Sequence, residues 1–239
     1  MVFDKKGNNP ALAVGYLFKG LKLLASTQLR TFIVIPVLIN VVLYSVALML
    51  GYYYVSDLID QFIPGWLQWL SWVLWPLFFI SFIIVGFFTF TVLANLISAP
   101  FYGKLAAKTQ AMISGQTNAS PEQPLAKVIG AELRRAGYLV TRALPLLILS
   151  IIPGINVIAP FLWALFGAWG MALEYMAYPL ENEGVLFAEQ KQLAKSIRLG
   201  ALSFGGLAVL GLTIPVLNII VAPAAVIGAT IYLNEIKQG

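Results

Sequence analysis

The chain has 239 residues, of which 60% are hydrophobic and only 10% charged, and its mean hydropathy is +0.86. A soluble domain carries about 25% charged residues, so this composition excludes a soluble globular protein and predicts a single membrane domain over residues 1–239. The net charge is +5, but the basic residues flank apolar segments, which indicates membrane topology and no nucleic-acid partner. The chain has no cysteine and no histidine. We therefore expect no metal site, and nothing in the sequence implies a cofactor.

Residues 11–24 alternate leucine-rich and lysine-bearing faces, which predicts an interfacial helix at the membrane surface or, equally well, a helix that covers the bundle. Residues 31–56 are free of charge for 26 residues, which predicts the first transmembrane span. The second span is predicted over 72–97, and Ser98-Ala99-Pro100 should end it. Tryptophan recurs at every third residue before and into this span, which fits an aromatic belt on one helix face: Trp66, Trp69, Trp72 and Trp75.

The stretch 101–142 is charged and has a break rich in glycine, serine and asparagine near 114–124, so we expect two cytoplasmic helices there. Two long apolar segments follow, 144–173 and 201–234, with a polar cytoplasmic segment at 174–200 between them. The apolar segments share a pattern: Pro153-x-x-Asn156 recurs as Pro215-x-x-Asn218, and Ala159-Pro160 recurs as Ala222-Pro223. Paired broken segments of this kind point to transport proteins.

Each repeated segment fits a hairpin better than a span. An unbroken helix over the 31 uncharged residues 143–173 would measure about 46 Å, whereas the hydrocarbon core is about 30 Å thick. If both hairpins enter and leave on one side, all 15 Lys and Arg lie on that side, and the loop 57–71 opposite holds only two Asp. The predicted fold is therefore an all-α integral membrane protein with two long transmembrane helices, two half-penetrating (re-entrant) helical hairpins and cytoplasmic helices.

A candidate anion site precedes the first span. Ser26 or Thr27 can cap the helix, so that the N–H groups of Gln28, Leu29 and Arg30 point out of its N-terminus, where the helix dipole favours anions. The Arg30 guanidinium adds a charge suited to an oxyanion. The alternative, which the sequence alone favours, is that this arginine only sets membrane orientation.

Four asparagines lie inside apolar stretches and are candidates to line a pore: Asn40, Asn95, Asn156 and Asn218. An amide donates an N–H to a passing anion without holding it as tightly as a charge does. The alternative for Asn156 and Asn218, which we favour, is that they complete tight turns. Asn40 and Asn95 have the alternative of bonding between helices.

The segment Glu174–Asn182 packs carboxylates, tyrosines and an amide closely. Glu174 and Glu181 offer a conceivable catalytic pair, but no nucleophile, metal-ligand set or phosphate-binding loop accompanies them. A structural turn is the favoured interpretation, and the chain is not expected to be an enzyme. No carboxylate lies inside an apolar segment, which argues for passive conduction or for ion coupling through backbone groups.

Three motifs resemble the CysZ family of bacterial inner-membrane sulfate permeases. They are Gln28-Leu29-Arg30-Thr31-Phe32 with Ile35-Pro36 and Asn40 downstream, Ala99-Pro100-Phe101 with Leu105-Ala106, and Tyr175-x-x-Tyr178-Pro179-x-x-Asn182 with Phe187. The first motif departs from the family's Gly-Leu-Arg-Arg, because Gln28 replaces the glycine and Thr31 the second arginine. The family's sulfate contacts therefore carry over to Leu29 and Arg30, with Gln28 and Thr31 in altered form.

The resemblance implies sulfate import across the bacterial inner membrane for cysteine biosynthesis, by a multi-pass protein that assembles as a homo-oligomer. The expected partners are sulfate, the lipid bilayer and further copies of the chain. The competing function is a non-conducting membrane scaffold or an assembly partner of another transporter, which would show the same composition and hairpins. A membrane enzyme comes third, for want of a site.

Overall fold

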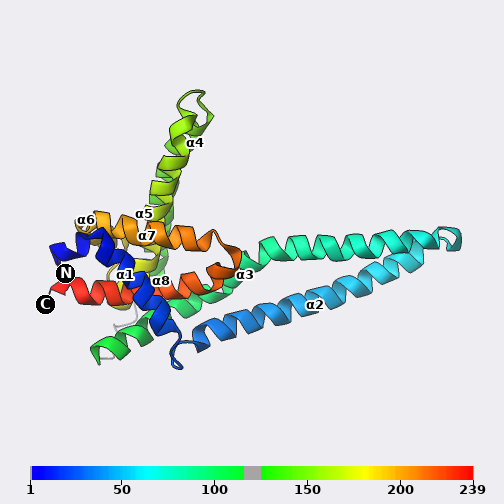
Figure 1. The fold of residues 1–239 in the computed structure, drawn as a ribbon, viewed down its shortest axis with the longest axis horizontal. Coiled ribbons are helices and arrows are strands. Elements are labelled where there is room, and N and C mark those ends of the chain that lie inside the picture. The colour runs from blue at the N-terminus through cyan, green and yellow to red at the C-terminus, as the bar shows by residue number, and fades with distance from the viewer. Residues whose placement is uncertain (1, 116–124, 239) are drawn as a thin grey trace. The chain divides into compact units, whose positions relative to one another are not determined.

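The computed structural model describes residues 2–115 and 125–238, and these residues fold as an all-helical membrane protein (Figure 1). Apart from the helices it has only a short antiparallel pair of strands, β1 (Val2–Phe3) with β2 (Lys237–Gln238), which joins the two ends of the chain. The chain forms two compact units: residues 33–98 make up one, and residues 1–32 together with 99–239 make up the other.

The smaller unit contains most of α2 (Thr31–Phe62), the 3₁₀ helix η2 (Gly65–Leu70) and the first part of α3 (Ser71–Ser114). With 32 residues, α2 is about 48 Å long and continues past the predicted end of the first span. Within this unit the two long helices pack through aromatic side chains: Tyr52 stacks on Trp75 with ring centroids 4.6 Å apart. Most other side chains of the unit are exposed, as expected of segments that face lipid.

The tryptophan repeat does not lie on a single α-helix face. Trp66 and Trp69 are on η2, and a 3₁₀ helix has three residues per turn, which places these two side chains on one side. Both are exposed, as is Trp72 at the start of α3. Trp75 instead turns onto Tyr52. The predicted belt is therefore built from two kinds of helix, and its last member has a packing role.

Helix α3 continues unbroken through Pro100, where the sequence led us to expect its end. A proline removes one backbone donor and bends a helix, but the helical hydrogen bonds on both sides of Pro100 keep the helix continuous. The same holds for α4 (Leu125–Ile151), which runs through Arg142 without separating a cytoplasmic helix from the first apolar segment. Charged and apolar segments thus share helices in both places.

The larger unit is built around α8 (Pro215–Ile236), and 78% of its most apolar stretch is buried. Helix α1 (Pro10–Leu24) packs on α8 and α7 (Arg198–Leu212), burying Leu17 and exposing Phe18, so it covers the bundle. The close approach depends on small residues, because a Cβ on Gly20 would meet the Ala224 carbonyl. Helix α5 (Ala159–Asn182) packs against α7 on another side.

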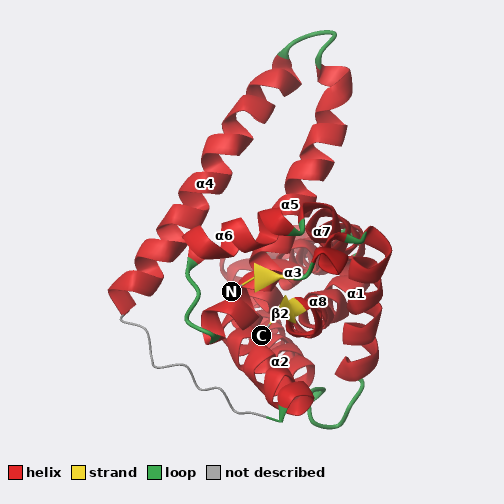
Figure 2. Cartoon of the chain, turned by 90° about the vertical axis from the view of Figure 1, so that its left-hand side faces the viewer, coloured by secondary structure: helices red, strands yellow, loops and turns green. Residues whose placement is uncertain are grey.

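Both predicted helix breaks are present. Helix α4 ends at Ile151, Gly154 adopts a φ of +84°, and the short η3 (Asn156–Ile158) leads into α5 (Figure 2). Helix α7 ends at Leu212 and α8 begins at Pro215. Glycine alone adopts such a φ without strain, and proline fits the first turn of a helix. Among the described residues, four helical stretches are long and apolar enough to span a membrane: Thr31–Phe62, Gly65–Gly86, Asn156–Asn182 and Leu217–Ile236. The depth that each hairpin reaches in a bilayer stays a prediction.

Candidate anion site and the Arg135 network

The candidate anion site lies in the link between α1 and α2. Leu29 is fully buried and anchors this link, whereas Gln28, Arg30 and Thr31 are exposed. The buried Leu29 side chain holds the backbone of the link in place, and the Arg30 guanidinium remains in solvent. Within the described part of the chain Arg30 forms no ion pair, so its charge is available to a ligand.

The backbone of the link already uses two of the three N–H groups that the sequence assigned to an anion. The Leu29 and Arg30 N–H groups both donate to the Ser26 carbonyl, at 3.2 and 3.1 Å. Ser26 Oγ is buried and has no hydrogen-bond partner among the described residues, so it does not cap α2. The guanidinium, and not a row of free amides, is therefore the group that this link leaves exposed as a candidate for an anion.

Of the two asparagines predicted on the long helices, Asn40 is fully buried on α2. Its Nδ2 donates to the Pro36 carbonyl, one turn earlier on α2, at 3.0 Å. Its Oδ1 is buried without a partner among the described residues. Asn95 lies on α3, but its side chain falls outside the described part of the chain.

The two asparagines at the helix breaks differ, although the sequence pairs them. Asn218 is buried, its N–H donates to the Ile214 carbonyl at 2.9 Å, and its Nδ2 donates to the Leu212 carbonyl at 3.1 Å, so it closes the break before α8. Asn156 begins η3 with an exposed side chain. Asn218 therefore completes a tight turn, as the alternative predicted, while Asn156 has an amide free to contact its surroundings.

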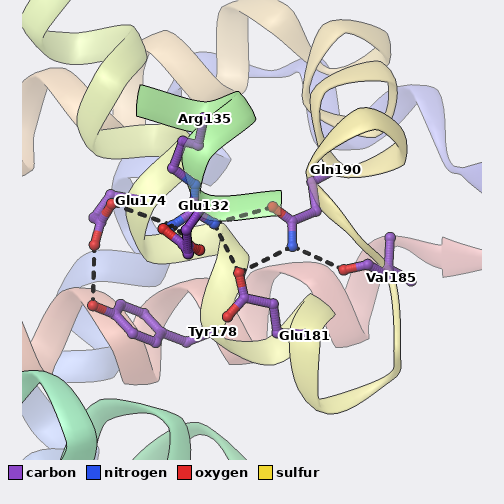
Figure 3. Close-up of polar contacts among 7 residues, drawn as sticks. All are labelled: Glu132, Arg135, Glu174, Tyr178, Glu181, Val185 and Gln190. Atoms are coloured by element: carbon purple, nitrogen blue, oxygen red, sulfur yellow. Dashed lines mark hydrogen bonds and ion pairs between the residues drawn. The ribbon is translucent and has the colours of Figure 1, made fainter. Parts of the chain in front are cut away.

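The Arg135 network is the polar centre of the larger unit (Figure 3). The Arg135 side chain on α4 is 8% exposed, and its guanidinium lies 2.8 Å from Glu181, 3.1 Å from Glu132 and 3.5 Å from Glu174. The side chain of Gln190, on α6 (Phe187–Ser196), accepts from the guanidinium at 3.2 Å and donates to the Val185 carbonyl at 2.8 Å. The network thus ties α4 to α5 and α6.

The charges of this network exclude it as a sulfate site. One guanidinium faces three carboxylates, which leaves a negative excess that repels an anion. Burial raises the pKa of the Glu132 carboxyl; the Arg135 charge opposes this, and Glu181 and Glu174 raise the pKa further. The network is therefore an anchor for helices and not an oxyanion site.

The sequence missed Arg135 because nothing local distinguishes it from Arg134. Glu174 and Glu181 were assigned to a turn, but both lie on α5, seven residues apart, which places them on one helix face. The tyrosine motif around them joins α5 to the end of α3: the Tyr178 ring meets the Tyr102 ring edge-on at 5.5 Å, and Asn182 Nδ2 donates to the Gly103 carbonyl at 2.9 Å. The segment is structural, with its contacts on a helix instead of a turn.

The long apolar helices, the repeated broken hairpins and the cation at the start of α2 define a multi-pass membrane protein with features of an anion transporter. Residues 16–223 match the family EI24, described as Sulfate transporter CysZ/Etoposide-induced protein 2.4. The chain belongs to this family.

Curated relatives agree with that assignment. A protein of Pseudomonas aeruginosa named Sulfate transporter CysZ is 38% identical over 91% of this chain and 92% of its own length. A protein of the same name from Pseudomonas syringae pv. tomato is 42% identical over 91% of this chain and 89% of its own length. Another, from Pectobacterium atrosepticum, is 37% identical over 91% of this chain and 82% of its own length.

Proposed function

We propose that this chain is a sulfate permease that lets sulfate enter across the bacterial inner membrane for cysteine biosynthesis, without ATP. The observation that carries the proposal is the similarity, along nearly the whole chain, to proteins named Sulfate transporter CysZ. The sequence contains no phosphate-binding loop of the Gly-x-x-x-x-Gly-Lys-Ser/Thr type, which favours passive conduction over ATP-driven transport.

The proposed sulfate site is formed by Gln28, Leu29, Arg30 and Thr31. Arg30 supplies the charge, Leu29 holds the link in place from the buried side, and the exposed side chains of Gln28 and Thr31 add hydrogen bonds. The two amides bound to Ser26 are not needed for this arrangement. A single guanidinium on an exposed link suits a permease, because a transported ion must also leave.

The proposed path runs past amides instead of charges, with Asn40, Asn95, Asn156 and Asn218 as the candidates to line it. A dianion does not cross hydrocarbon unaided, since the desolvation of even one charge costs many kcal/mol. The two long helices and two hairpins of one subunit are too few to enclose an aqueous path comfortably. We therefore propose a homo-oligomer, with the path inside or between its subunits.

Sulfate flux into liposomes that contain only the purified protein tests the function. A permease raises radiolabelled sulfate uptake along the sulfate gradient with no nucleotide present, and uptake saturates at high sulfate. Protein-free liposomes and liposomes with an unrelated membrane protein give the background. A signal equal to that background would favour the non-conducting scaffold and overturn the proposal.

The proposed site is tested by calorimetric titration of Arg30 variants with sulfate. Arg30→Ala removes a charge-assisted hydrogen bond of about 1.5–3 kcal/mol, so affinity should fall about ten- to a hundredfold. Arg30→Lys should recover only part of it, because the fork geometry is lost. Thr31→Arg, which restores the family's second arginine, should tighten binding. The control Lys22→Ala, an exposed cation on α1, should change little. Equal affinities for the wild type, Arg30→Ala and Arg30→Lys would eliminate this site.

A further inference from the structure

A second cationic feature of the larger unit lies away from the α1–α2 link. Helices α4, α5, α6 and α7 enclose a cleft of about 570 Å³, lined by three cations and by apolar and aromatic side chains: Tyr138, Arg142, Leu165, Phe166, Trp169, Lys195, Arg198 and Leu202. No carboxylate lines it among the described residues. Helix α6 lies beside both α4 and α5 (Figure 2), and α7 contacts α5 and α6.

The cations reach the cleft from three separate elements. Arg142 lies on α4, 3.7 Å above the Tyr138 ring, and the Tyr138 hydroxyl in turn accepts from Trp169 Nε1 at 3.0 Å. Lys195 and Arg198 stand on either side of the sharp bend of 104° between α6 and α7. Among the described residues none of the three cations forms an ion pair, and all three are exposed. The cleft is thus a preformed site of positive potential.

A basic residue at position 198 agrees with the positive-inside rule, but its place in the helix is unfavourable for a cation. Arg198 is the first residue of α7, where the helix dipole is positive, so a cation there destabilises the helix. The Arg198 charge and the N-terminus of α7 therefore both contribute positive potential at the same end of the cleft. An anion bound at that end removes the repulsion, which indicates a ligand.

The apolar wall identifies what kind of anion fits. Arg142 and Arg198 each mark the point where a long uncharged stretch begins, so they stand at the expected membrane boundary. Beyond these cations the cleft is lined by apolar side chains of α5 and α7, namely Leu165, Phe166 and Leu202. A free oxyanion gains nothing from such a wall, whereas the glycerol and upper acyl carbons of a lipid cover it. The volume is also that of a pocket for a ligand far larger than a single oxyanion.

We propose that this cleft binds the headgroup of an anionic phospholipid, with its phosphate held by Arg142, Lys195 and Arg198. The lipid phosphate sits at the bend between α6 and α7, and its glycerol backbone lies on Phe166 and Leu202. Basic pockets between membrane helices on the cytoplasmic side are typical sites for anionic lipids. The proposal is independent of the sulfate site, because it involves none of residues 28–31.

Native mass spectrometry of the full chain in detergent, titrated with short-chain phosphatidylglycerol or phosphatidylcholine, tests the site. The wild type should retain phosphatidylglycerol at least tenfold more strongly than phosphatidylcholine. The variant Arg142→Gln/Lys195→Gln should lose most of that preference. The matched control Lys104→Gln/Lys108→Gln removes two exposed cations of α3 that do not line the cleft, and it should stay within about twofold of the wild type.

A second variant guards against a folding defect. Lys195→Gln/Arg198→Gln leaves the Arg142–Tyr138 stacking intact and should reduce phosphatidylglycerol binding to the same degree, with an unchanged melting temperature. Three results would overturn the proposal. One is an equal loss of phosphatidylglycerol preference in the α3 control, which would show that the preference depends only on the total charge of the protein. Another is equal retention of both lipids by the wild type. The third is displacement of phosphatidylglycerol by millimolar sulfate, with sulfate affinity lost in the cleft variants and kept in Arg30→Ala, which would make the cleft an oxyanion site.

Discussion

Helices α7 and α8 form one hairpin and helices α4 and α5 form another, around breaks of the same sequence pattern. Only the first hairpin has a helix, α8, that other helices cover along most of its length, although the residues at its break are exposed, with Leu210 at 65% and Ile214 at 49%. Helix α8 is covered by α1, α5 and α7. The tip of the α4–α5 hairpin is open to its surroundings, with Ile151 79% and Phe161 72% exposed. One pattern has therefore produced a core element and an exposed element in the same unit.

The side chains explain this difference. Helix α8 carries small residues on the faces that meet its neighbours, including Ala222, Ala225 and Ala229, all buried. Small residues let helix backbones approach closely, as in membrane bundles generally. The tip of α4–α5 instead carries exposed bulky residues such as Ile151, Val157 and Phe161, which suit contact with lipid or with another subunit. The α7–α8 hairpin is held by packing along its length. The α4–α5 hairpin is held at its base by Arg135 and farther along by two tryptophan hydrogen bonds, Trp169 Nε1 to the Tyr138 hydroxyl and Trp163 Nε1 to Ser150 Oγ, each at 3.0 Å.

The largest effect should come from removing the Arg135 charge at the base of the α4–α5 hairpin. Arg135→Leu leaves Glu132, Glu174 and Glu181 facing one another with no buried cation, so the free energy of unfolding should fall by about 3–5 kcal/mol. Thermal and denaturant unfolding in detergent measure this loss. Arg134→Leu, a change at an exposed neighbour, is the control and should change stability little. Similar unfolding curves for the two variants would show that the network does not hold the hairpin.

The packing of the α7–α8 hairpin against α5 is tested at Gly205 on α7. A Cβ there would lie directly against the Ala168 carbonyl oxygen and 2.7 Å from the Ala172 backbone nitrogen, so α5 and α7 would have to separate. Gly205→Ala should lower the free energy of unfolding by about 3 kcal/mol. In Gly167→Ala the new Cβ meets only Val209 Cγ2 at 3.7 Å, and the change should be neutral or stabilise by up to about 1 kcal/mol. Unfolding in detergent distinguishes them, and a harmless Gly205→Ala would refute close packing at this crossing.

The two breaks should respond differently to the same substitution. Asn218→Ala removes the bond to the Leu212 carbonyl in a buried turn and should cost about 1 kcal/mol of unfolding free energy. Asn156→Ala changes an exposed side chain and should cost less than about 0.5 kcal/mol. If Asn156 lines the sulfate path, its replacement should instead lower sulfate flux in liposomes at unchanged stability. The reverse order of the two stability losses would contradict the contrast between the hairpins.

The smallest effect concerns pH. Because burial raises the pKa of Glu132 above its ordinary value of 4.5, the folded protein binds a proton that the unfolded chain releases. The contribution of Glu132 to stability is therefore fully present below pH 4.5 and is lost as pH rises through the raised value. Glu132→Gln should flatten this part of the pH profile and unfold at a slightly higher temperature near neutral pH. The side chain is 49% exposed, so solvent screening keeps the shift small. An unchanged pH profile in melting experiments would contradict the pKa shift.

Much of the fold was predictable because its signals are local. Gly154 and Pro215 interrupt helices through their own backbone chemistry, so both breaks fall where the sequence placed them. The long uncharged stretch from Thr31 predicted a long helix for the same reason. Pro100 shows the limit of this reasoning, because a single missing hydrogen bond was outweighed by the helix on both sides.

The candidate site was only partly predictable. The exposure of Arg30 follows from a cation at the start of an apolar helix. The engagement of the Leu29 and Arg30 amides by Ser26 depends on how the link turns, which the residue types do not specify. Asn156 and Asn218 looked equivalent in sequence, and their environments became distinct through the helices that pack around them.

The sequence by itself determined the membrane class, the helical fold, the positions of the breaks and the basic residues at the ends of the apolar segments. These follow from hydrophobicity, proline and glycine chemistry, and charge, each of which acts within a few residues. Only the tertiary structure decided that α8 is buried while the α4–α5 tip is exposed, that Arg135 pairs with Glu181 46 positions away, and that Arg142, Lys195 and Arg198 meet in one cleft. Such contacts depend on the free energy of packing distant segments together, which no local pattern encodes.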